Sequence, residues 1–118
     1  MDSRAEDDRN PTWATFDLAE LLSQREEMAE PWLAFLQVST LSAGLYVLPE
    51  GGIDHQDPHD VDELYYIVSG KAMIQVEEDS RQVRPGSLVY VRAHAEHRFH
   101  TIEEELRVLV FFSAAEPQ

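Results

Sequence analysis

The stretch from Gly51 to Gly70 constrains the fold of this 118-residue chain more than any other. It places two histidines, a glutamine and several carboxylates in a short loop, GGIDHQDPHDVD, that leads directly into the apolar segment 64–68. That segment is rich in β-branched and aromatic residues, which favour strands. A polar loop held by a rigid strand is a common site of chemistry, so we interpret 51–70 as one half of a metal site.

His59 and Glu63 are the first two candidate ligands. They are four residues apart, and side chains alternate along an extended chain, so the two would share a face if the chain between them is extended. Imidazole plus carboxylate is a ligand mix typical of divalent transition metals. The site then needs another nitrogen ligand, and the candidates lie in the segment 85–101, which contains His94, His97 and His100.

These two stretches resemble the two signature motifs of the cupin family of small β-barrels, and the similarity covers residues 43–112. The first motif consists of glycine, five residues, His-x-His, three or four residues, glutamate, six residues and glycine. The residues found at these offsets are Gly51, Asp57, His59, Glu63 and Gly70. The second motif consists of glycine, five residues, Pro-x-Gly, two residues, histidine, three residues and asparagine. The residues found at these offsets are Gly86, Arg92, His94, His97 and Thr101.

The chain departs from the family pattern at four of these positions. Asp57 replaces the first histidine, Arg92 the proline, His94 the glycine and Thr101 the asparagine. Carried over position by position, the resemblance implies that His59, Glu63 and His97 bind a metal ion.

Three neighbouring side chains compete to be the fourth ligand. Asp57 holds the family position, but it is short and Pro58 restricts the backbone beside it. His55 would share a face with His59 if the segment is straight. Gln56 becomes the candidate if the loop carries one extra residue, as bulges beside sites often do, and some small cupins are similar in having a Gln-x-Pro-His motif. We favour Gln56 over His55.

The ligand set indicates the class of metal and of chemistry. Two histidines, one carboxylate and a weak fourth ligand suit Fe(II), Mn(II), Ni(II), Co(II) or Zn(II), which would act as a Lewis acid or activate oxygen. We therefore predict a metal-dependent dioxygenase or isomerase of a small organic molecule, with Tyr65 and Phe99 lining the pocket and no catalytic residue assigned. The alternative is a non-catalytic module that binds a metal or a small ligand. His94 is interpreted as a turn residue and His100 as outward-facing.

Composition limits the possible partners and the compartment. Twenty-three acidic side chains outnumber nine basic ones, for a formal net charge of −14, which argues against nucleic acids and anionic membranes as partners. Cysteine is absent and no stretch is long and apolar enough to cross a membrane, so we expect a cytoplasmic protein. Adaptation to a salt-rich cytosol is one explanation of the acidity, and an ordinary acidic soluble protein is the other.

The pattern of turns and apolar runs predicts an all-β fold. Residues 1–12 are predicted to be a flexible acidic tail, and 13–118 a single domain that begins with a short helix at 16–25. About eight short strands follow: 32–38, 41–48, 63–68, 72–76, 81–84, 88–91, 97–102 and 106–112. This pattern, together with the resemblance, implies a double-stranded β-helix or jelly-roll barrel with one short N-terminal helix.

Alternation along the strands predicts an oligomer. If Glu63 points into the barrel, Tyr65 and Ile67 do too, and the outward face of that strand, Leu64, Tyr66 and Val68, is too apolar for water. The run 109–112 is also apolar on both faces, and strands of this kind are buried on both faces. One short helix cannot cover both strands, so we expect a homodimer.

Overall fold

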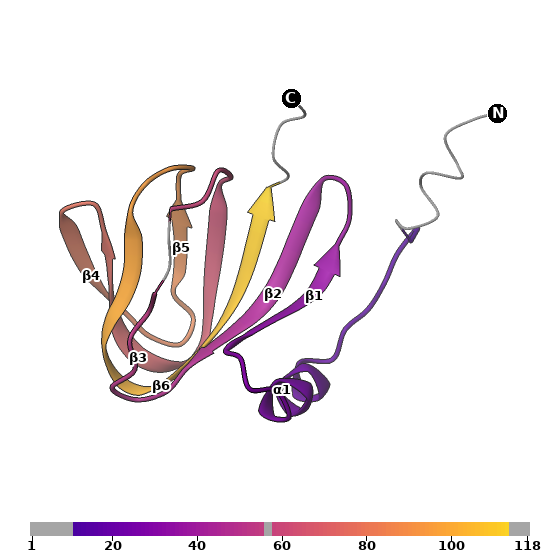
Figure 1. Cartoon of the computed structure of the whole chain (residues 1–118), viewed down its shortest axis with the longest axis horizontal. Helices are drawn as coiled ribbons and strands as arrows, with labels where there is room; N and C mark the ends of the chain where they lie inside the picture. Colours follow the sequence, from indigo (N-terminus) through magenta and orange to yellow (C-terminus); the bar gives the residue numbers. More distant parts are fainter. Residues whose placement is uncertain (1–10, 56–57, 114–118) are drawn as a thin grey trace.

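The structure is a computed structural model that describes residues 11–55 and 58–113. The described ranges contain one helix and six strands (Figure 1). They are α1 (Leu18–Glu26), β1 (Trp32–Gln37), β2 (Leu41–Leu48), β3 (Glu63–Val76), β4 (Asp79–Val83), β5 (Leu88–Val91) and β6 (His97–Ser113). Residues 1–10 of the expected tail, and Gln56 and Asp57, lie outside the described ranges, so the expectations for them stay predictions.

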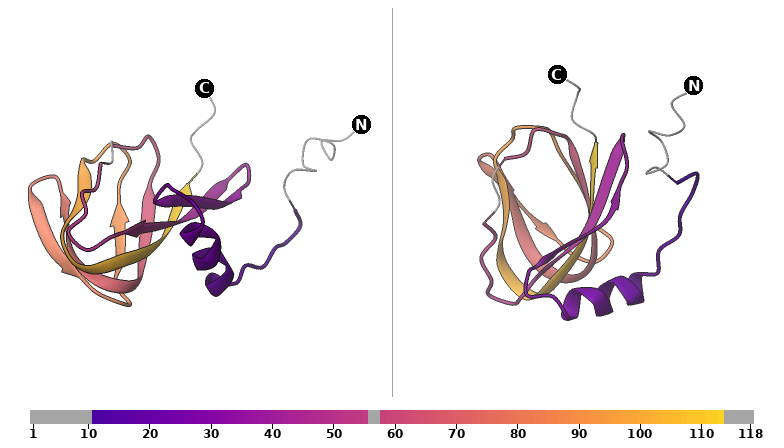
Figure 2. Two further views of the ribbon diagram at one scale, coloured as in Figure 1. Left: turned by 60° about the horizontal axis from the view of Figure 1, so that its bottom comes forward. Right: turned by 45° about the vertical axis from the view of Figure 1, so that its right-hand side comes forward.

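The strands form one antiparallel sheet that curls around a core without closing. Its order is β1-β2-β6-β3-β4, and β5 pairs with β3. The first half of β3 lies between β5 and the end of β6, whereas its second half lies between β4 and the start of β6. The two long strands therefore run through both sides of the roll (Figures 1 and 2).

The eight expected strands become six because two expected breaks are bends inside strands. Gly70 lies within β3 and the acidic run 103–105 lies within β6, and the pairing between these strands shifts register there. Gly70 has a φ of +102°, and a Cβ at this position would collide with the carbonyl group of Glu105. Glycine is needed here for this close approach, so it marks a bend and not the end of a strand.

The inward and outward faces of β3 follow the expected alternation. Glu63, Tyr65 and Ile67 are only 2%, 1% and 0% exposed, whereas Leu64 and Tyr66 are 41% and 39% exposed. Tyr65 and Ile67 join a core contributed mainly by β3 and β6.

The helix covers one part of the outer face, as expected. Asp17 caps it by accepting a hydrogen bond from the backbone N–H of Ala19 across 2.8 Å, which satisfies one of the free donors of the first turn. Leu21 packs with Leu45 and Val47 of β2 in a second core cluster. Figure 2 shows α1 outside the roll, beside β1 and β2. The described residues include no helix with the length and apolar character needed to cross a membrane.

Candidate metal site

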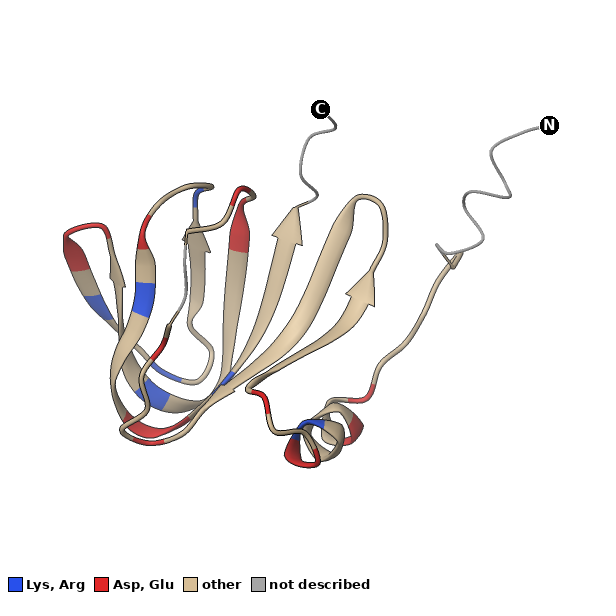
Figure 3. Cartoon of the chain, in the orientation of Figure 1, with Lys and Arg blue, Asp and Glu red and all other residues tan. Residues whose placement is uncertain are grey.

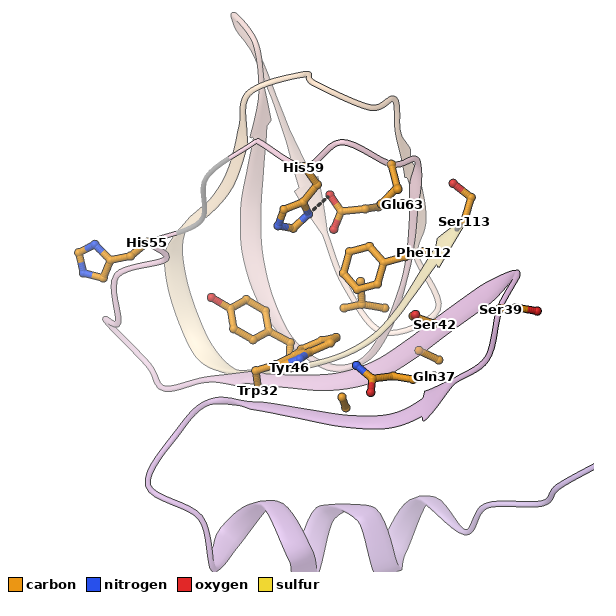
Figure 4. A pocket seen from close by; sticks show the side chains of 14 residues that line it. Trp32, Gln37, Ser39, Ser42, Tyr46, His55, His59, Glu63, Phe112 and Ser113 are labelled. Carbon is orange, nitrogen blue, oxygen red and sulfur yellow. Dashed lines mark ion pairs between the residues drawn. The ribbon is translucent and has the colours of Figure 1, made fainter. Parts of the chain in front are cut away.

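Three side chains from separate positions in the chain meet inside the roll. His59 lies in the loop before β3, Glu63 is the first residue of β3, and His97 is the first residue of β6. Their potential ligand atoms all lie within 4.8 Å of one another. The Oε1 atom of Glu63 is 2.9 Å from Nδ1 of His59 (Figure 4). The same oxygen is 2.9 Å from Nε2 of His97.

The contacts of His97 determine which of its nitrogens faces the site. Its Nδ1 is 2.8 Å from the carbonyl oxygen of Ala95, which can only accept a hydrogen bond. Nδ1 therefore carries the proton in the neutral ring and donates it to Ala95, and Nε2 turns its lone pair towards Glu63. A histidine whose second nitrogen is held by a carbonyl is a typical metal ligand.

The site nitrogens lack the partners that buried polar atoms normally have. Nδ1 of His59 and Nε2 of His97 are buried, and among the described residues neither makes a hydrogen bond of acceptable geometry, despite the short distances to Glu63. A buried nitrogen without a partner lowers the stability of the fold unless something binds it, and a bound metal ion would be such a partner. Two ligands about 2.1 Å from one ion and at right angles to each other lie about 3 Å apart. The three side chains therefore fit a shared cation.

Negative charge dominates the electrostatics of the site. Burial alone lowers the pKa of the His97 imidazole. The Glu63 carboxylate, the Ala95 carbonyl group and the charge of Asp54 outweigh that effect and raise the pKa above its ordinary value. The same negative groups would attract a divalent cation, which must displace a proton from His97 at low pH.

Tyr65 and Phe99, which we expected to line the pocket, are each 1% exposed and belong to the core. The Tyr65 hydroxyl donates a hydrogen bond to Oε2 of Glu63 across 3.1 Å, and its ring packs edge-on against Phe99. This contact holds the carboxylate with Oε1 towards the histidines. That Tyr65 and Phe99 line the pocket stays a prediction. Their contacts support a role in holding the Glu63 carboxylate from beneath.

The remaining histidines of the two motifs do not join the cluster. His55 is exposed, and the side chain of His94 is 74% exposed, at 3.7 Å from Asp60. His100 is paired with the Ser80 hydroxyl, which lies 3.1 Å from its Nε2. Among the described residues, only His59, Glu63 and His97 form a group able to hold a metal.

Two departures from the motif pattern coincide with unusual backbone. His94 and Thr101 have φ values of +70° and +51°, in the left-handed region that residues with a Cβ rarely adopt. The motif has glycine and asparagine at these two positions, and these residue types enter the left-handed region most readily. The backbone therefore keeps the shape of the motif although the side chains differ.

A cavity of about 820 Å³ opens from the site. His59 and Glu63 line one part of it, and Trp32, Gln37, Tyr46 and Phe112 line other parts (Figure 4). Sequence reasoning missed these four residues because Trp32, Tyr46 and Phe112 lie in apolar runs and are of types common in any core, and Gln37 is a single polar residue at the end of such a run. Alternation along the strands could have placed Tyr46 and Phe112 inward, but not beside a cavity.

Comparison with known proteins agrees with this architecture. Residues 44–112 match the family model described as "Cupin domain". An uncharacterized protein of Streptomyces coelicolor, SCO3923, is 48% identical over 101 residues, which cover 86% of this chain and 96% of that protein.

Solved structures show the same fold. KdgF from a Halomonas species has a TM-score of 0.67 at 21% identity, over 76% of this chain and 86% of that chain. An RmlC-like cupin family protein of Methanocaldococcus jannaschii, described as a double-stranded β-helix, has a TM-score of 0.69 at 15% identity, over 89% and 92% of the two chains. The expected double-stranded β-helix is confirmed, and the chain belongs to the cupin family.

Proposed function

We propose that this protein binds one divalent transition-metal ion through His59, Glu63 and His97 and uses it to act on a small organic molecule in the adjoining cavity. The observation that carries this proposal is the pair of buried imidazole nitrogens without hydrogen bonds, each 2.9 Å from the same carboxylate oxygen. Fe(II), Mn(II), Ni(II), Co(II) and Zn(II) all accept this ligand set.

The protein would orient the metal ligands and supply the negative charge that attracts the ion. Ala95 holds the His97 ring and Tyr65 holds the Glu63 carboxylate, so both ligands are oriented before an ion arrives. Phe112 packs against His59 with ring centroids 5.4 Å apart and forms an apolar wall beside the site. A metal ion held here would supply Lewis acidity or oxygen activation. We therefore infer an oxygenase or isomerase, with a non-catalytic binding module as the alternative.

Metal analysis and turnover assays test the two readings. The purified protein is expected to hold close to one equivalent of a transition metal, or to take it up when Fe(II), Mn(II), Ni(II), Co(II) or Zn(II) is added. Oxygen consumption with Fe(II) is then measured against phenols, thiols and keto acids, and isomerisation is followed by NMR. Stoichiometric metal without turnover favours the binding module, and absence of metal binding contradicts the enzyme and leaves only a module that binds a small ligand.

We also propose that the protein is a cytoplasmic homodimer. The helix leaves apolar residues uncovered on two adjacent strands, with Leu64 and Tyr66 on β3 paired to Tyr90 and Leu88 on β5. Leu88 and Tyr90 are 65% and 62% exposed, which extends the face that the sequence predicted. These four residues are uncharged in a chain of net charge −14. Strongly acidic copies repel each other, so an uncharged face is where a second copy can pack. Figure 3 shows the ribbon tan, without charged residues, along most of β5 and the neighbouring part of β3.

A further inference from the structure

The cavity has an aromatic corner formed by Trp32, Tyr46 and Phe112, which begins at Phe112 beside His59 and extends away from the candidate ligands. The Trp32 ring lies 6.2 Å from the Tyr46 ring at an interplanar angle of 68°, and 5.8 Å from the Phe112 ring at 71°. The indole is steeply inclined to both other rings, so the corner presents aromatic surfaces in more than one direction. Figure 4 shows Phe112 next to His59 and Glu63, with Trp32 and Tyr46 farther from them.

The backbone is shaped to hold the indole in this corner. Gly44 lies on β2, and a Cβ at this position would collide with the Trp32 ring. The indole therefore lies directly against the β2 backbone, in space that any other residue at 44 would occupy. The φ of Gly44 lies outside the left-handed region, so the backbone conformation does not require glycine at this position. Glycine instead makes room for the Trp32 ring, so the position of this ring in the cavity is part of the design of the fold.

A buried carboxylate lies behind one ring of the corner. The Tyr46 hydroxyl donates a hydrogen bond to Oδ1 of Asp54 across 2.6 Å, and Oδ2 of Asp54 accepts one from the backbone N–H of Phe99 across 2.8 Å. Asp54 is only 5% exposed and lies behind Tyr46. Because the hydroxyl proton points at Asp54, the Tyr46 oxygen offers only lone pairs to a ligand.

Positive side chains are absent from the described lining of the cavity, which contains neither lysine nor arginine. Apart from the exposed His55 imidazole and an ion bound by His59, Glu63 and His97, these residues offer an anion no positive counter-charge. A cation would meet aromatic rings, the lone pairs of the Tyr46 oxygen and, behind it, the charge of Asp54. Alkylated cations bind well in such surroundings, because aromatic faces attract the charge and also remove the alkyl groups from water.

We propose that the aromatic corner of Trp32, Tyr46 and Phe112 holds an alkylated onium group, ammonium or sulfonium, of the small molecule that the protein binds. That the other end of this molecule meets a metal ion rests on the function proposed above, whereas binding of the onium group in the aromatic corner does not depend on that function. The ligand class is a small organic cation or zwitterion whose other end carries an oxygen able to reach the candidate metal ligands.

The test compares three probes of nearly equal shape and different charge. Choline is a cation, 3,3-dimethylbutan-1-ol is its neutral carbon analogue, and 3,3-dimethylbutanoate is an anion of similar size. Titration calorimetry with the full chain is expected to show choline binding about tenfold more tightly than the neutral alcohol. Once the metal has been removed with a chelator, 3,3-dimethylbutanoate should bind no more tightly than the neutral alcohol.

Variants assign the preference to the corner. Trp32→Leu is expected to reduce the choline-to-alcohol ratio to about one. Trp13→Leu is the matched control, because Trp13 is 79% exposed and does not line the cavity, and it should leave the ratio unchanged. If Trp32→Leu does not fold, Trp32→Phe serves instead and should reduce the ratio only in part. A ratio near one in the wild type, a ratio unaffected by Trp32 variants, or no binding of choline overturns the proposal.

The two proposals fail in distinguishable ways. Choline preference with no stoichiometric metal would support the corner and contradict the metal site. Stoichiometric metal with no choline preference would support the metal site and contradict the corner. Both titrations use the same protein, so binding of either choline or metal shows that the protein is folded when the other ligand fails to bind.

Discussion

The backbone N–H of His94 donates a hydrogen bond to the carbonyl oxygen of His59 across 2.7 Å. This bond joins the loop that precedes β3 to the turn that precedes β6. The backbone N–H of Ala93 strengthens the junction by donating to Oδ1 of Asp62 across 2.9 Å. Because His59 and His97 come from these two separate segments, the junction sets how far apart the two imidazoles lie and so preorganises the candidate metal site.

The first prediction concerns the three candidate ligands. His59→Ala and His97→Ala should each abolish stoichiometric metal binding, because each variant leaves a single imidazole among the ligands of the ion. Metal content after dialysis and titration calorimetry measure the loss, and circular dichroism checks the fold. His100→Ala is the control, since His100 is paired with Ser80 away from the cluster. Wild-type occupancy in both ligand variants would place the metal elsewhere.

The second prediction concerns the fourth ligand. We expect Gln56→Ala to weaken metal binding more than His55→Ala or Asp57→Ala, with a loss of about 10- to 100-fold. His55 is the strongest rival, because it lines the cavity and is the better donor in isolation. Competition titrations against a chelator of known affinity rank the three variants. A larger loss for His55→Ala would reverse the assignment.

The third prediction concerns the left-handed backbone at His94. His94→Gly should be more stable than His94→Ala by about 1 kcal/mol, because only glycine adopts this conformation without a steric penalty. At the exposed strand residue Arg98 the order should reverse, with alanine more stable than glycine by about 0.5–1 kcal/mol. Urea unfolding of the four variants without metal gives both differences. The same order at both positions would contradict the strain at His94.

The fourth prediction concerns Tyr46 and alkaline pH. Burial, followed by the hydrogen bond and the charge of Asp54, raises the pKa of the Tyr46 hydroxyl above its ordinary value. The folded protein therefore keeps this proton at a pH where the unfolded chain loses it, so the wild type loses stability as the pH rises above about 10. Tyr46→Phe has no such group. It should be less stable at pH 8 by about 1–3 kcal/mol, because Asp54 loses a partner.

The stability difference between wild type and Tyr46→Phe should shrink between pH 9 and pH 11. Urea unfolding at each pH measures it, and Tyr90→Phe is the control because Tyr90 is 62% exposed. A difference that stays constant over this range would show that Tyr46 ionises alike in the folded and unfolded protein.

The fifth prediction concerns assembly. Light scattering at micromolar concentration should give twice the chain mass of 13.5 kDa. Leu88→Glu should convert the dimer to a monomer, because it places a charge in the apolar face of β3 and β5. Ile53→Glu is the matched control, since Ile53 is 68% exposed in a loop outside that face. A wild-type mass near that of one chain would contradict the dimer.

The class of the fold and the two faces of its strands could be predicted from the order of residues. With Glu63 pointing inward, alternation places Tyr65 inside and Leu64 and Tyr66 outside, because the side-chain period of a strand is two residues and depends on nothing distant. Motif spacing selected His59, Glu63 and His97 before their proximity was known. These inferences need only local geometry and a resemblance, both of which can be read from residue order.

Where distant segments meet depends on the packing of the folded chain and could not be predicted in this way. Nothing in the order of residues indicates that Gly70 approaches the Glu105 backbone, so a bend inside a strand was read as a turn. Asp54 looked like any other acidic residue of an acidic chain until the fold buried it between Tyr46 and the backbone of Phe99. The aromatic corner likewise exists only because β1, β2 and β6 are neighbours, and strand pairing between distant segments is set by the packing of the whole chain.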